Sequence, residues 1–274
     1  DTQAGEFARV PDQTSIAAAA KLAGKTADGL SVGILESVTA RERADLTGPG
    51  GERQETVEPL TNWFVGRVTQ DLRAGQTVVG GMLTSVVRDI DDPHLGFLER
   101  QAWAGGVDLK HLFRDRDFRL VARLLGSHLR GSEEAILGAQ TAPARYFQRP
   151  DNGHADVDPS RTALSGHAGS VMLTRTGNGA NLMCQVGGAW RSPGFEINDL
   201  GYMRTADEIN QFAWVGYVQR EPRGAFNYWQ VNGNGWIDWD FGGARLNRAL
   251  NLNASGQLRG QQRFQVSATR NFGR

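Results

Sequence analysis

The sequence has a single cysteine, Cys184, which excludes an intrachain disulfide framework and a cysteine-based metal site. Lysine is confined to Lys21, Lys25 and Lys110, and 30 basic residues balance 30 acidic residues. A formal net charge of zero gives no indication of a nucleic-acid partner or an anionic membrane surface. The chain also lacks any run of about 18 apolar residues, which excludes a transmembrane helix. Transmembrane strands carry a much weaker signal, so this absence says little about them.

The signatures of common enzymes are missing as well. The chain contains no G-x-S-x-G elbow, no H-E-x-x-H pair, no P-loop and no G-x-G-x-x-G turn. Its five histidines are scattered between His94 and His167 without a spacing typical of a site. We therefore expect no enzymatic activity, no catalytic residue and no cofactor.

Glycine, in contrast, is abundant. There are 35 glycines in 274 residues, and each interior glycine costs a helix about 0.5–1 kcal/mol relative to alanine. A two-residue alternation recurs in place of helical periodicity, as where Leu182, Cys184 and Val186 alternate with Met183 and Gln185. This pattern predicts an all-β chain whose sheet has two chemically different faces.

About twelve strands are predicted from this alternation. Several have ten or more residues, which is long enough to cross a bilayer when the strand is tilted. The expected ranges are residues 15–24, 30–39, 60–72, 77–88, 101–112, 117–130, 162–175, 180–191, 209–220, 225–239, 246–254 and 263–272.

The connections between these strands alternate in length. Short turns rich in Gly, Asp and Asn are expected at 24–29, 72–75, 113–117, 176–180 and 221–224, and long polar segments at 40–59, 89–100, 131–161 and 192–208. Tight turns at one end and long loops at the other are typical of outer-membrane barrels. Aromatic residues near strand ends are expected to form the interfacial girdles of such a barrel: Trp63, Trp103, Trp190, Tyr217, Trp229, Trp236 and Trp239.

Three segments carry a family resemblance: residues 16–39 (IAAAAKLAGKTADGLSVGILESVT), 146–151 (YFQRPD) and 192–201 (SPGFEINDLG). They resemble the barrel region of certain bacterial outer-membrane proteins in which an N-terminal carbohydrate-binding, family-9-like domain precedes a C-terminal β-barrel domain of unassigned function. The resemblance follows most of the chain in order. It implies an antiparallel, up-and-down transmembrane β-barrel in the bacterial outer membrane, and it supplies the only link to carbohydrate.

Two differences from that pattern bear on domain organisation. The sequence does not include the carbohydrate-binding domain, so sugar recognition by that domain is not transferred to these residues. The chain ends Asn271-Phe272-Gly273-Arg274, whereas complete barrels of this type commonly close on an aromatic residue. We expect residues 1–274 to form a single barrel domain within a larger protein. Because a bilayer does not tolerate unpaired strand edges, further strands or a partner chain should close this incomplete barrel.

If the chain forms a barrel, the polar faces of its strands line the lumen. Charged residues inside a pore tune solute selectivity, although inward polar groups also satisfy one another around a plugged interior. The lumen-lining candidates are Arg119, Arg123, Asn181, Gln185, Arg191, Asn247, Asn251, Asn253 and Gln265.

One loop is rich in possible metal ligands. Asp151, Asp156 and Asp158 lie close to His154 in the sequence, and oxygen-rich loops of this kind can hold Ca²⁺. The spacing does not match an EF-hand, and the same residues are typical of a solvated turn. We therefore expect no bound metal. If the loop does bind one, these three aspartates are the candidate ligands, although weak ones.

Two further clusters admit a functional interpretation. Glu196, Asn198, Asp199 and Asp207 share a long loop with Arg191 and Arg204, and paired carboxylates can hydrolyse glycosides when suitably spaced. Ion pairing or solvation in the loop is the simpler account of these charges. A second cluster combines amides with indole rings, which suits either sugar binding or a polar lumen and interface. It comprises Asn227, Trp229, Gln230, Asn232, Asn234, Trp236 and Trp239.

The sequence therefore predicts an outer-membrane β-barrel that acts as a channel or as a membrane anchor, in contact with lipid and linked to carbohydrate binding or uptake. The alternative is a soluble secreted β-sheet protein that binds or hydrolyses polysaccharide through its acidic loops. A third hypothesis is a barrel segment that folds only with a partner in a larger assembly. No nucleic-acid partner is expected.

Overall fold

The computed structural model describes residues 6–176 and 179–272, and this part of the chain forms a large sheet, a small sheet and one α-helix. The large sheet has 12 strands in the order β15-β14-β13-β12-β11-β10-β9-β8-β7-β6-β3-β2. Every neighbouring pair in it is antiparallel. The strands are β2 (Ile16–Lys25), β3 (Leu30–Thr39), β6 (Leu60–Leu72), β7 (Thr77–Asp89), β8 (Glu99–Phe113), β9 (Phe118–Gly131), β10 (Ala163–Arg175), β11 (Leu182–Arg191), β12 (Glu208–Gln219), β13 (Phe226–Trp239), β14 (Arg245–Leu258) and β15 (Arg263–Asn271).

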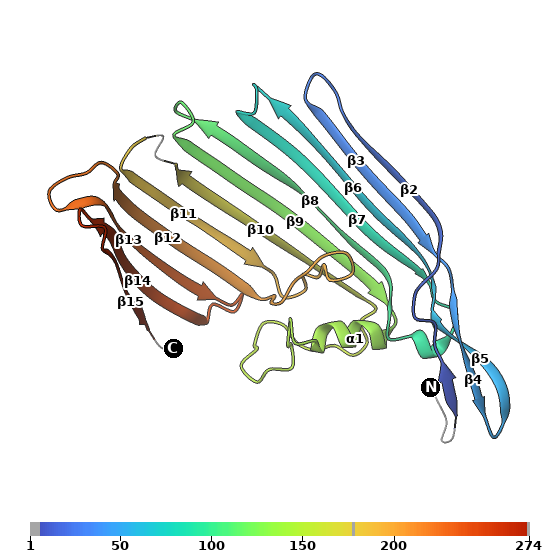
Figure 1. Ribbon diagram of the computed structural model, residues 1–274. Coiled ribbons are helices and arrows are strands. Elements are labelled where there is room, and N and C mark those ends of the chain that lie inside the picture. Colours follow the sequence, from blue (N-terminus) through green and yellow to red (C-terminus); the bar gives the residue numbers. More distant parts are fainter. Residues whose placement is uncertain (1–5, 177–178, 273–274) are drawn as a thin grey trace.

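These strands confirm the prediction of an all-β, antiparallel, up-and-down sheet of twelve strands. Short turns join the strands at one end, and the long connections lie at the other (Figure 1). The predicted turn at 176–180 falls partly outside the described residues, because it includes residues 177 and 178.

The sheet is open, so the prediction of a barrel is confirmed only in its strand order. Strands β2 and β15 form the two edges of the described sheet and do not pair with each other. They lie at opposite sides of the molecule in Figure 1. The twist and curvature of twelve strands bend this sheet but do not bring its edges together.

The predicted loop at 40–59 is instead a hairpin, and here the sequence-based prediction was wrong. Strands β4 (Glu42–Gly48) and β5 (Gly51–Glu58) pair with each other, and β1 (Phe7–Arg9) pairs with β4 to complete a separate three-stranded sheet. Only a few apolar side chains, such as Ala44 and Leu46, are buried by it. The hairpin was missed because most of its residues are polar on both faces.

Helix α1 (Glu133–Thr141) and a 3-10 turn (Pro93–Leu95) lie within segments that were predicted to be polar loops. Ser132 caps α1, since its hydroxyl accepts a hydrogen bond from the Ala135 amide at 3.0 Å. Two acidic residues in the first turn stabilise the helix, because their negative charge lies at the positive end of the helix dipole. In the part of the chain that the structure describes, no helix is long and apolar enough to cross a membrane.

Candidate functional site

The large sheet has one polar face and one apolar face, because side chains alternate along each strand. Cross-strand pairing defines the two faces. One row of the polar face runs across the sheet through Gly80, Asp108, Arg123, Ser170, Ala189, Asn210, Asp238 and Asn247. A neighbouring row of the apolar face runs through Val79, Leu109, Ala122 and Val171.

The apolar face presents large aliphatic side chains that no part of the described chain covers. Val107, Val266 and Leu252 are 61%, 63% and 67% exposed. The same face carries further exposed residues on almost every strand: Leu22, Val68, Val79, Leu83, Leu124, Val171, Val186, Val215, Val231 and Leu250. A continuous exposed apolar surface of this extent is rare in monomeric soluble proteins.

Aromatic side chains border the apolar face at both ends of the strands. At the loop end these are Trp103, Trp190 and Trp239, and at the turn end they include Phe113, Phe118, Tyr217 and Trp229. Phe113 stacks on Phe118 with ring centroids 5.3 Å apart, and Tyr217 lies 5.4 Å from Trp229. Trp63 and Trp236 lie on the polar face instead, so these two were wrongly assigned to a girdle.

Two long connections, residues 132–162 and 192–207, fold over part of the polar face, and we call them the cap. Side chains of the cap pack on β7–β10 in two clusters. Ile136 and Phe147 join Val86, Leu129 and Leu164 in the first cluster. The second cluster brings Phe195, Met203 and Ala206 of the cap onto Ala168, with Leu125 beside it.

A buried ion pair holds the two halves of the cap together. The guanidinium of Arg145 contacts the carboxylate of Glu196, and the Arg145 side chain is 1% exposed. Arg145 also donates to the carbonyl oxygens of Ala139, at 2.7 Å, and Phe195, at 3.3 Å. Burial lowers the pKa of Arg145 to about 10, which leaves the side chain charged at neutral pH.

A second ion pair fixes the cap to the sheet. Arg88, near the loop end of β7, donates to Asp199 at 2.7 Å and to the carbonyl oxygen of Glu99 at 2.8 Å. Asn198 accepts a hydrogen bond from the Met203 amide at 2.6 Å. Since Asp199 and Glu196 each have an arginine partner, the two carboxylates are engaged in structure rather than free as an acid–base pair.

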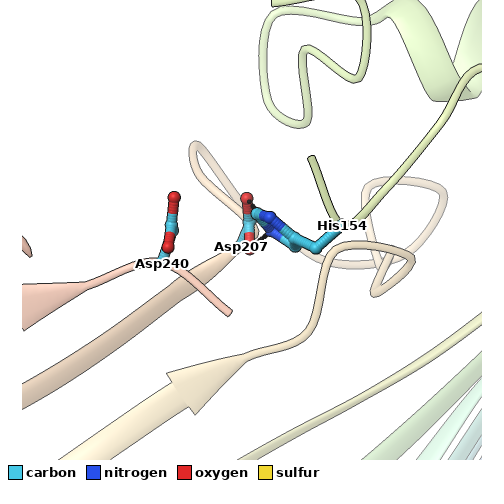
Figure 2. Close-up of side chains that lie close together, drawn as sticks. All are labelled: His154, Asp207 and Asp240. Carbon is cyan, nitrogen blue, oxygen red and sulfur yellow. Dashed lines mark hydrogen bonds and ion pairs between the residues drawn. The ribbon is translucent and has the colours of Figure 1, made fainter. Parts of the chain in front are cut away.

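A polar latch joins the cap to the ends of β12 and β13, and it consists of Arg149, His154, Asp207 and Asp240 (Figure 2 shows the last three). Nη2 of Arg149 lies 2.5 Å from Asp207 Oδ2 and 3.2 Å from Asp240 Oδ2. Nε2 of His154 lies 2.8 Å from Asp207 Oδ1. Backbone amides of Phe241 and Ala244 donate to the same two carboxylates, at 3.0 and 2.7 Å.

The donor set of the latch has the composition of a metal site, but its charge is already balanced within the chain. His154, Asp207 and Asp240 each offer a ligand atom, and these atoms lie within 4.8 Å of one another. The guanidinium of Arg149 contacts both carboxylates, where a cation would have to bind. Asp207 and Asp240 are only 2% and 5% exposed, so the latch is best described as a closed structural contact.

The weak metal candidates Asp151, Asp156 and Asp158 do not form a common site in the structure. Asp151 lies 3.4 Å from Nε of Arg149, and Asp158 accepts hydrogen bonds from Ser160 at 3.0 and 2.7 Å. The group of possible ligands contains none of these three aspartates. Only their neighbour His154 belongs to it.

The sequence did contain a signal for the contact between Asp207 and Asp240. The predicted turn at 221–224 makes residues 209–220 and 225–239 a hairpin, and Ile209 indeed pairs with Trp239. Asp207 and Asp240 directly flank these paired ends. The contribution of Arg149 had no such signal, because it comes from a loop whose path the strand pattern does not determine.

Most of the lumen-lining candidates lie on the polar face. This is where cross-strand pairing places Arg119, Arg123, Gln185, Arg191, Asn247, Asn251, Asn253 and Gln265. Asn181 precedes β11, and its amide donates to the Tyr217 hydroxyl at 3.3 Å. Whether these residues face a lumen stays a prediction, since the sheet is open.

A charged region of the polar face lies on β6, β8 and β9, beside the cap. Nη1 of Arg67 is 2.5 Å from Asp108 Oδ2, although β7 lies between their strands. Gly80 permits this contact, because a Cβ there would lie 2.6 Å from the Arg67 guanidinium. A cavity of about 390 Å³ lies between this region, which includes Arg123, and Leu200 of the cap.

A family model described as "Domain of unknown function (DUF5916)" matches residues 1–273, and the chain belongs to this family. No curated protein matches the sequence. The family description carries no activity, so the resemblance to outer-membrane proteins with a carbohydrate-binding domain stays a prediction.

Proposed function

We propose that this member of the DUF5916 family forms part of the wall of a β-barrel in the bacterial outer membrane. The observation that carries the proposal is the apolar face, with exposed aliphatic side chains in the middle of the strands and aromatic side chains at both ends. Outer-membrane barrels present such a band, about 25 Å tall, to lipid. The polar face and the cap then face the interior.

The lengths and the hydrogen-bonded pairing of the strands support a membrane barrel over a soluble sheet. Strands β6–β10 have 13 to 15 residues each, more than the 9–11 that a tilted strand needs to cross the hydrocarbon core. Every strand between the edges pairs on both sides, so its backbone groups are satisfied without water. A soluble sandwich would bury its apolar face against a second layer, and the described residues supply none there.

Closure of this wall must involve strands β2 and β15, because unpaired edges are not tolerated in lipid. Twelve alternating strands make β2 and β15 antiparallel to each other. An even number of further strands, from a longer form of this chain or from a partner, would therefore complete an antiparallel barrel. Both edges continue the same alternation, with Lys21 and Thr269 on the polar face and Leu22 and Ala268 on the apolar face.

The cap favours one of the two roles expected for such a barrel, that of a membrane anchor. Its hydrophobic clusters and ion pairs lie against β7–β10, so this part of the interior is filled rather than open. We infer a capped barrel that anchors the protein in the membrane and restricts passage through its interior. No catalytic role is proposed, since Glu196, Asp199 and Asp207 of the cap are each paired with an arginine.

A thiol placed on either face of one strand tests the proposal. In a Cys184→Ala background, Val186→Cys puts the thiol on the apolar face and Gln185→Cys puts it on the polar face. We expect the chain to float with phospholipid vesicles, and the thiol at 186 to be protected from a charged, membrane-impermeant maleimide until the protein is unfolded. The thiol at 185 should react in the vesicle-bound protein.

Equal labelling of the two thiols in the presence of vesicles would overturn the proposal. So would a chain that remains folded in the aqueous phase without detergent, and this second outcome would favour the soluble, polysaccharide-binding alternative.

A further inference from the structure

The polar face is divided into a charged part and an uncharged part. On β6–β9 its side chains include Arg67, Asp108, Lys110, Arg119 and Arg123. In the middle of β11–β15 the same face carries only amides, hydroxyls, small residues and aromatic rings. The charges nearest to this uncharged part, such as Glu208 and Asp238, lie at the loop end of their strands.

One cross-strand row of the uncharged part combines an aromatic ring with three amides and a hydroxyl. The pairing places Gln185, Trp214, Asn234, Asn251 and Thr269 side by side on five successive strands. The next row brings Phe212 of β12 beside Trp236 of β13. A hollow of about 350 Å³ is lined by residues that include Gln185, Phe212, Trp214, Asn234 and Trp236.

The ring of Trp214 lies against the sheet. A Cβ at Gly216 would lie 2.6 Å from two atoms of the indole, so the ring occupies the space above Gly216 where a side chain would stand. Trp214 is half-buried in this position, which leaves part of the indole open toward the interior. Gly216 therefore positions an aromatic platform on the polar face.

The amides beside this platform offer both donors and acceptors. Oδ1 of Asn234 is enclosed and accepts no hydrogen bond from the described residues. Asn253 donates to Asn232 at 2.9 Å, and Asn251 donates to Thr269 at 2.8 Å. An enclosed acceptor without a donor costs free energy, and a ligand hydroxyl would remove that cost once the Asn234 side chain turned toward the interior.

We propose that this region, Trp214 and Trp236 with Gln185 and Asn234, binds a neutral oligosaccharide. The apolar faces of sugar rings can pack on aromatic side chains, and sugar hydroxyls can hydrogen-bond to amides. An ionic ligand is disfavoured, because the region holds no opposite charge to offset the loss of hydration. The inference rests on the proposed function, in which the polar face lies away from lipid.

Isothermal titration of the purified full chain in detergent micelles with maltohexaose, cellohexaose and xylohexaose tests the inference. We expect binding of at least one neutral hexasaccharide, and no competition by the anionic hexagalacturonate. Trp214→Ala should weaken this binding by about tenfold, equivalent to about 1.4 kcal/mol, because the variant removes the ring on which a sugar would pack.

Two further variants separate positioning from general damage. Gly216→Ala should also weaken binding, because the added methyl displaces the indole, and it should shift the fluorescence emission of Trp214. Trp103→Ala removes an indole from the apolar face and should leave saccharide affinity unchanged.

Failure of all three neutral saccharides to bind would overturn the inference, as would binding that Trp214→Ala leaves unchanged or that depends on Arg123 instead. These outcomes are distinct from failure of the proposed function. A chain that inserts into vesicles without binding saccharide refutes only the inference. A chain that binds saccharide but stays out of the membrane refutes only the membrane role.

Discussion

An arginine introduced on the apolar face should destabilise the folded protein far more than an arginine introduced at the adjacent position on the polar face. Val186 lies near the middle of β11, between Leu173 and Ala213 on the neighbouring strands, and it is 53% exposed. An arginine at the midplane of a lipid-facing barrel surface costs about 2–4 kcal/mol. Val186→Arg should therefore lower the ratio of folded to unfolded protein by about 30- to 700-fold, since each 1.4 kcal/mol is a factor of ten.

Gln185→Arg is the matched control, because it changes the adjacent residue on the polar face. In an aqueous interior such a substitution should change the free energy of unfolding by no more than about 0.5 kcal/mol. Urea titrations of both variants in phospholipid vesicles measure the difference, with heat-modifiable gel mobility as the readout of folding. In water, Val186→Arg at a half-exposed position would also be nearly neutral. Equal stability of the two variants in vesicles would therefore refute the assignment of the apolar face to lipid.

Three further predictions concern the cap and the small sheet. Arg145→Met should destabilise the protein by about 3–5 kcal/mol in urea titrations, because it leaves the Glu196 carboxylate buried without its partner. The double variant Arg145→Met with Glu196→Met should recover much of this loss of stability. No recovery would contradict the ion-pair account. Asp207→Asn should increase proteolysis within residues 142–162, since the carboxylate is what holds the latch. Asp207→Gly tolerates the positive φ of 56° at this position but also lacks the carboxylate, so it should be cleaved there as well. The Ser15 amide donates to Glu42 at 2.7 Å and lowers the pKa of that carboxyl, so this contact should be present at neutral pH and lost as the pH falls through that lowered pKa. Amide exchange at Ser15 should then accelerate relative to neighbouring amides, and Glu42→Gln should abolish this pH dependence; an unchanged dependence in that variant would refute the assignment.

The sequence was sufficient to predict the strands of the large sheet, because several of them alternate clearly between apolar and polar residues and turn-forming residues separate the rest. In β11, Leu182, Cys184 and Val186 fall on one face and Met183 and Gln185 on the other, as the pattern required. Short turns then determined which strands pair. The register of the weakly patterned strands did not follow from the sequence. In β7, Val78 and Val86 lie on one face and Val79 and Val87 on the other, so a slip by one residue would exchange two apolar faces.

The cap was beyond reach of the same reasoning, because its contacts are not periodic. The pair formed by Arg145 and Glu196 joins residues about fifty positions apart through loops whose paths depend on packing against the sheet. The local signals that were present, such as Ser132 followed by two glutamates, identify a helix start but not where the helix lies. A hairpin as polar as β4–β5 gives an equally weak signal, since it buries little apolar surface.

The lengths of the connections determine which part of the polar face remains accessible. The long segments that form the cap leave the sheet at β9 and β11, and their ion pairs and clusters anchor them over β7–β10. At the same end, β13 and β14 are joined only by residues 240–244, which are too short to fold over the sheet. The charged region is therefore beside the cap, while nothing comparable in residues 6–176 and 179–272 covers the uncharged region of β11–β15. In a capped barrel the two regions lie at the same depth, because Arg119 shares one cross-strand row with Gln185 and Trp214. The cap therefore leaves the aromatic and amide side chains as the more accessible part of the interior at that depth.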